Sequence, residues 1–97
     1  MNPNPAHQLA EVLRQTRMLL ALPGNDFGWS HWNSMEEALC EFDALIDPIN
    51  KGDAPPVSEL GRLFAPTGSI QEVSINSGWG EEFLALAQRF DTLIKKI

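Results

Sequence analysis

The sequence predicts an all-α protein, a small antiparallel bundle of about four helices with an irregular segment near residues 66–77. Three observations lead to this fold class. Apolar residues recur at intervals of three and four in several stretches, which is the pattern of amphipathic helices. Proline and glycine separate these stretches. The length of 97 residues suits one domain, so we assign residues 1–97 to a single helical domain.

The first predicted helix follows residues 1–5, which we expect to be disordered because two of these five residues are prolines. Asn4 can cap the helix, and Pro5 can occupy its first turn. Residues 18–22 are apolar all round, so that end is either enclosed by the fold or part of an interface. The Pro-Gly pair at 23–24 ends the helix. One face of the helix carries Leu9, Val12, Leu13, Thr16, Leu19 and Leu20.

The second predicted helix has both the largest apolar face and the most acidic face of the chain. Two starts are open: Ser30 as the N-cap, or Ser34 with Glu37 as a capping box one turn later. The helix ends at about Asp47 or, through a kink at the following proline, at Ile49. Its apolar stripe comprises Trp32, Met35, Leu39, Phe42, Ile46 and Ile49.

The second half of the chain predicts a short helix, an ambiguous segment and a long helix. The prolines at 55–56 occupy the first turn of the short helix, whose apolar positions fall between Val57 and Phe64. Residues 69–76 combine a capping-box pattern with strand-like alternation. Because a lone strand has no partner, we expect a helical turn followed by extended chain. The long helix opens at 77–78, and its stripe is Trp79, Phe83, Leu86, Phe90, Leu93, Ile94 and Ile97.

Charge and composition exclude several classes of function. Thirteen acidic and seven basic side chains give a net charge of −6, so we expect no nucleic-acid partner, because few cations are left to neutralise phosphates. The same balance disfavours an anionic membrane surface. No apolar run approaches the roughly 20 residues that cross a bilayer. With one cysteine and no signal-peptide pattern, the chain is expected to be cytoplasmic.

The residues that could carry chemistry do not form a recognisable pattern. Cys40 and His31 fall on opposite sides of the second helix, and the acidic neighbours of Cys40 oppose formation of a thiolate. His7 lies in a different element from His31, and no CxxC, HExxH or EF-hand spacing occurs. The acid pairs at 36–37 and 81–82 are explained by their position at helix N-termini. We therefore predict no enzyme, no cofactor and no metal site.

The best candidate site is the acidic side of the second helix, together with the aromatic loop before it. No Lys or Arg occurs between Trp29 and Asn50, and uncompensated negative charge favours a basic partner. A merely solvated helix face is the alternative. Phe27 and Trp29 are of the type enriched at binding hot spots, although they could equally cap one end of the core. The predicted partner-binding residues are Glu36, Glu37, Glu41, Asp43, Asp47, Phe27 and Trp29.

Two stretches, residues 63–90 and the pattern WxxxxxALxEFDxLI at 32–46, resemble small uncharacterised bacterial proteins. In size, acidity and helical class the chain is similar to immunity and antitoxin proteins, which neutralise toxins in bacterial competition. The resemblance implies a protein–protein interaction module, an immunity- or antitoxin-like inhibitor that masks a basic surface of a toxin or enzyme. The alternative is a homodimeric structural or assembly protein, joined through Met18 and Leu22 or through Leu84.

Overall fold

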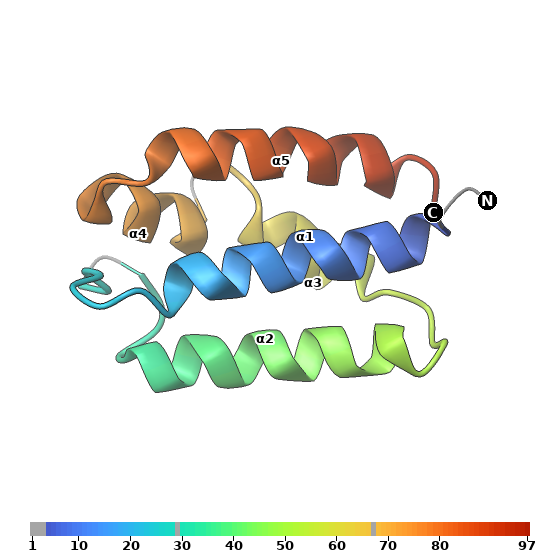
Figure 1. Cartoon of the computed structure of the whole chain (residues 1–97), viewed down its shortest axis with the longest axis horizontal. Coiled ribbons are helices and arrows are strands. Elements are labelled where there is room, and N and C mark those ends of the chain that lie inside the picture. The colour runs from blue at the N-terminus through green and yellow to red at the C-terminus, as the bar shows by residue number, and fades with distance from the viewer. Residues whose placement is uncertain (1–3, 29, 67) are drawn as a thin grey trace.

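The computed structural model describes residues 4–28, 30–66 and 68–97. Within these residues the chain forms five α-helices and no strand (Figure 1), so the predicted all-α class is confirmed. No helix in these ranges has the length and apolar character needed to cross a membrane. The helices are α1 (Pro5–Leu20), α2 (Met35–Asn50), α3 (Val57–Leu63), α4 (Ser69–Ser77) and α5 (Gly80–Ile94).

Helix α1 is the central helix of the fold, because it packs against both other long helices, α2 and α5 (Figure 1). It runs antiparallel to both of them, and α2 and α5 point in the same direction. The short helices α3 and α4 connect the end of α2 to the start of α5, and α4 also packs against α5. Residues from all five helices, with Trp32, Phe64 and Trp79 outside them, form one buried apolar cluster.

Helix α1 begins with the cap that the sequence predicts. The side chain of Asn4 accepts a hydrogen bond from the backbone N–H of Ala6 at 2.8 Å, and Pro5 is the first helical residue. This arrangement satisfies one of the free N–H groups of the first turn. The expectation of disorder is therefore wrong for Asn4 and Pro5, while residues 1–3 lie outside the described residues.

Helix α2 begins at the later of its two predicted starts. The hydroxyl of Ser34 accepts the backbone N–H of Glu37 at 3.2 Å, and the Glu37 carboxylate accepts the backbone N–H of Asn33 at 2.6 Å. The helix then continues through Pro48 to Asn50, so the extra turn is present. Trp32, which the stripe placed on this helix, lies in the loop before it and is nevertheless buried.

The segment 69–77 is helix α4, so the predicted irregular segment near 66–77 is wrong over these residues, and so is the extended chain expected within it. Ile70 and Val73 are fully buried, and their spacing of three suits a helix rather than a strand. The helix ends at Gly78, whose φ of 88° is the left-handed conformation that glycine adopts readily. This extra helix raises the predicted number from about four to five, and α5 begins at Gly80 instead of 77–78.

Asn25 connects the loop after α1 to the start of α5. Its side-chain amide nitrogen donates to the carbonyls of Leu19 at 2.8 Å and Leu20 at 3.0 Å, at the end of α1. Its side-chain oxygen accepts the indole N–H of Trp79 at 2.9 Å. One amide therefore binds two terminal helix carbonyls and the polar atom of a buried tryptophan.

We expect Asn25→Ala to lower the free energy of unfolding by about 2–3 kcal/mol, because the buried indole N–H of Trp79 loses its acceptor. Urea denaturation followed by circular dichroism measures the change. Asn33→Ala is the matched control, since Asn33 is exposed and its side chain forms no hydrogen bond within the described residues. We expect that control to stay within about 0.5 kcal/mol of wild type. Equal losses in the two variants would contradict the bridging role of Asn25.

Candidate functional site

The five acidic residues of α2 form the surface that we call the α2 acidic face: Glu36, Glu37, Glu41, Asp43 and Asp47. At about 100° of rotation per residue, Glu36, Asp43 and Asp47 share one side of the helix, and Glu37 and Glu41 share the adjacent side. Four of the five are exposed and Glu41 is half-buried. The structure therefore presents the predicted acids to solvent, on two neighbouring sides of one rigid helix.

Two of these carboxylates have cationic partners that the sequence analysis did not assign. Arg17 of α1 donates two hydrogen bonds to the carboxylate of Asp43, from Nε at 2.7 Å and from Nη2 at 3.0 Å. The ammonium group of Lys51 lies 2.9 Å from the carboxylate of Asp47. The prediction of uncompensated charge is therefore wrong for Asp43 and Asp47. Their side chains nevertheless remain 61% and 62% exposed, so both carboxylates stay accessible to a second partner.

The other three acids have no Lys or Arg partner within residues 4–28, 30–66 and 68–97. Glu37 uses its carboxylate to accept a backbone N–H at the start of the helix. Glu41 faces the imidazole of His31 at 3.4 Å. Glu36 is exposed and its carboxylate forms no hydrogen bond or ion pair with any described residue, so it is the acid most available to a partner.

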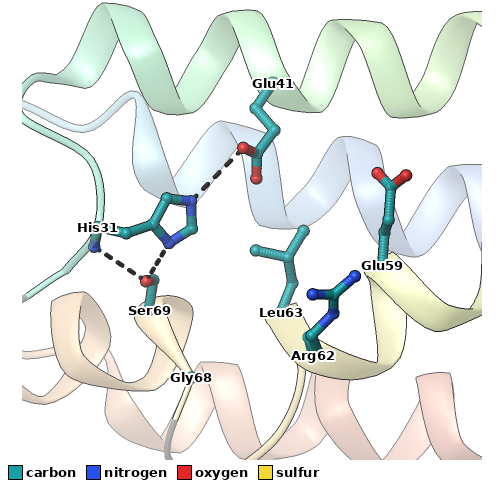
Figure 2. A pocket seen from close by; sticks show the side chains of 7 residues that line it. All are labelled: His31, Glu41, Glu59, Arg62, Leu63, Gly68 and Ser69. Carbon is teal, nitrogen blue, oxygen red and sulfur yellow. Dashed lines mark hydrogen bonds and ion pairs between the residues drawn. The ribbon is translucent and has the colours of Figure 1, made fainter.

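A pocket of about 450 Å³ lies beside the α2 acidic face, between α2, α3 and the start of α4 (Figure 2). His31, from the loop before α2, lines one side of the pocket, across from Arg62 and Glu59 of α3 (Figure 2). The ring Nδ1 lies 2.5 Å from the hydroxyl of Ser69, the backbone N–H of His31 donates to the same hydroxyl at 3.1 Å, and the ring Nε2 faces Glu41. The pocket is lined by His31, Glu41, Glu59, Arg62, Leu63, Gly68 and Ser69.

The row of carboxylate, imidazole and hydroxyl has the composition of a hydrolytic triad, but its contacts favour a structural role. The Ser69 hydroxyl already accepts the backbone N–H of His31, so it holds the loop onto the first turn of α4. The His31 side chain is 53% exposed, and 3.4 Å is long for a bond that orients a catalytic imidazole. In the neutral ring, Nδ1 can accept from Ser69 while the Nε2–H points to Glu41.

Sequence reasoning did not find this cluster, because its members are distant in the chain. His31 and Ser69 are 38 positions apart. The local signal at Ser69 was a capping box with Glu72, but Gly68 is the N-cap of α4 and no side-chain cap bond forms there. The hydroxyl that the pattern assigned to a helix cap is used instead in a tertiary contact.

The two aromatic residues of the candidate site have different outcomes. Phe27 is half-buried and packs against the edge of the apolar cluster, so part of its surface closes the core and part stays open to solvent. Trp29 lies outside the described residues.

Cys40 is an exposed free cysteine on α2. Within the described ranges, no three His, Cys, Asp or Glu side chains come together as metal ligands would.

Comparisons of this chain with models of protein families, with curated proteins and with solved structures give no match in any of the three cases.

Proposed function

We propose that this chain is a protein-binding module whose α2 acidic face contacts a basic surface of another protein. The observation that carries the proposal is the excess of exposed carboxylate on one helix. Five acids lie on α2, and three of them, Glu36, Glu37 and Glu41, have no Lys or Arg partner among the described residues. Like charges held close together repel, so a cationic partner gains affinity, association rate and orientation from this surface.

The fold supports this use of the surface because it holds the helix that carries the acids in place before binding. Helix α2 is anchored on the core by Phe42, Leu45 and Ile46, on its opposite side. The ion pair between Arg17 and Asp43 also ties α2 to α1. A partner that binds here meets a helix backbone that the core already holds in place, so no backbone has to be ordered on binding.

The more specific form of the proposal is an immunity- or antitoxin-like inhibitor, which masks the basic site of a toxin or enzyme. A small, rigid, acidic protein suits this role, because steering between opposite charges speeds capture of the partner before it acts. Phe27, half-buried against the core, leaves part of an aromatic side chain open for an apolar contact with the partner. The exposed thiol of Cys40 fits a reducing compartment, and we place the protein in the cytoplasm.

A pull-down from the native lysate with matched charge variants tests the proposal. Glu36→Lys changes the α2 acidic face without removing any ion pair, and Glu81→Lys is its control. Both residues are exposed acids in the first turn of a long helix, so the two variants change the net charge equally and lose a similar interaction with the helix dipole.

We expect wild type and Glu81→Lys to retain one stoichiometric basic protein at low salt and to release it at high salt. Glu36→Lys should bind that protein about tenfold more weakly, a difference of about 1.4 kcal/mol. Circular dichroism confirms that each bait is folded. Retention of the partner by Glu36→Lys at wild-type strength would remove the α2 acidic face from the interface. Recovery of the bait without any stoichiometric protein would contradict the binding module itself.

A further inference from the structure

A second surface, between helices α1 and α5, has the features of an interface. A groove of about 450 Å³ runs between α1 and α5. One side of this groove is formed by Gln15, Met18 and Leu19 of α1, together with Leu22 just after the end of the helix. The side chain of Met18 is 71% exposed and that of Leu22 is 44% exposed. Two large apolar residues are therefore left uncovered along one groove.

The α5 side of the groove is formed by Glu82, Ala85, Leu86 and Arg89, which follow the i, i+3, i+4, i+7 spacing of a helix seam. Because α1 and α5 are antiparallel, Gln15 lies beside Arg89, to which it is joined by a 3.0 Å hydrogen bond. Leu22 consequently lies toward Glu82, at the other end. The groove is thus apolar in the middle, positive at one end and negative at the other.

We propose that this groove is the interface of an isologous homodimer, in which α1 and α5 of two copies pack into a four-helix bundle. A two-fold axis through the middle of the groove, near Ala85 and Leu86, places Glu82 of each copy against Arg89 of the other. Ala85 is small enough for the two α5 helices to approach closely at the crossing. The same axis crosses α1 between Met18 and Leu19, so the side chain of Met18 is covered by Met18 and Leu19 of the other copy. Leu22 then lies against the side chain of Gln15 of the other copy.

The charges of the groove identify a second copy as its occupant. Glu82 and Arg89 have opposite signs and lie seven positions apart, on either side of the proposed axis. Neither forms an ion pair within the described residues, so both are available to a partner. Such a surface is complementary to itself, because one copy presents in reverse order the charges that the other requires.

The other exposed apolar site, at Leu84, does not have this property. Leu84 lies in a separate groove formed with α3 and α4, and its side chain is 57% exposed. Asp91 is the single charged residue among the described residues that line this groove. A two-fold axis there would bring like charges toward each other without a cation to pair with them. Leu84 is therefore a suitable control position for the α1–α5 interface.

Sedimentation velocity over micromolar to millimolar concentration tests the proposal. We expect wild type to show a monomer–dimer equilibrium, and Met18→Asp to weaken the dimer at least about 100-fold because it places a charge in the apolar middle of the groove. Leu84→Asp should leave the dissociation constant unchanged. A wild-type protein that remains a monomer throughout, or a dimer that Leu84→Asp disrupts and Met18→Asp does not, would overturn the proposal.

A charge exchange tests the symmetry of the dimer independently of apolar contact. Glu82→Arg alone and Arg89→Glu alone should each weaken the dimer about tenfold, since each converts two attractive pairs into repulsive ones. An equimolar mixture of the two variants should recover dimerisation, because all four charges then meet opposite charges. A mixture that dimerises no better than either variant alone would overturn the proposed pairing. Neither variant alters the α2 acidic face, so both retain the partner binding proposed above.

Discussion

Phe42→Ala is expected to lower the free energy of unfolding by about 3–5 kcal/mol, the largest effect of any single change considered for this chain. Phe42 is completely buried in the middle of α2, and its ring lies 6.3 Å from that of Trp32, measured between centroids. Removal of the ring leaves a cavity that the surrounding helices can fill only in part. A domain of this size has a total stability of about 5–15 kcal/mol, so this loss is a large fraction of it.

Urea denaturation measures the effect of Phe42→Ala, with two variants for comparison. Phe42→Leu keeps most of the apolar volume and should cost no more than about 1.5 kcal/mol. Leu84→Ala removes a large apolar side chain from an exposed position and should stay within about 0.5 kcal/mol of wild type. A loss below about 1 kcal/mol for Phe42→Ala would mean that the stripe of α2 does not anchor this helix to the core.

Gly68→Ala is expected to lower the free energy of unfolding by about 2–3 kcal/mol through a steric clash. A Cβ atom at Gly68 would lie 2.7 Å from the carbonyl oxygens of both Arg62 and Leu63. These are backbone atoms, so relief of the contact requires α3 and α4 to separate. The φ of Gly68 is −81°, which any residue can adopt, so the requirement for glycine here arises from close packing and not from backbone conformation.

Gly61→Ala is the matched control for Gly68→Ala, and we expect it to have the opposite sign. Gly61 lies inside α3, and a Cβ atom there would meet no atom within 4 Å. Alanine should therefore stabilise the helix by about 0.5–1 kcal/mol. Denaturation curves of the two variants give the comparison. A similar small change in both would contradict the close approach of the α4 start to the end of α3.

The parts of the fold that depend on local chemistry could be predicted from the sequence. Asn4 with Pro5 and Ser34 with Glu37 are capping patterns that lie within a few residues, and both form as expected. Trp32 is a residue for which helical spacing predicted the burial correctly and the conformation wrongly. Its spacing matched the helix stripe and it is buried, yet it lies in the loop before α2, because burial does not require helical conformation.

The parts that depend on tertiary contacts could not be predicted in the same way. Val73 to Ile75 alternate like a strand, but Ile70 and Val73 are buried together in the core, and this packing selects the helix α4. The ion pair of Arg17 with Asp43 joins positions 26 apart, so a search for cations within the acidic stretch did not find it.

The environment of the apolar end of α1 could be predicted only in part from the sequence. The all-apolar run at 18–22 indicated that this end was either enclosed or part of an interface, and the structure leaves Met18 and Leu22 exposed. The sequence alone did not reveal that α5 lies alongside with Glu82 and Arg89 at opposite ends of the groove. Helical spacing gives the face of each helix, whereas the choice of neighbour comes from the packing of the whole chain.

The salt dependence of binding to the captured partner tests most directly whether the α2 acidic face makes the contact. Affinity is measured by calorimetry at a series of salt concentrations for wild type, Glu36→Lys and Glu81→Lys. We expect the affinity of wild type and Glu81→Lys to fall steeply and equally as salt rises, and that of Glu36→Lys to start lower and fall less steeply. An affinity that is independent of salt, or identical curves for Glu36→Lys and wild type, would contradict the proposed function.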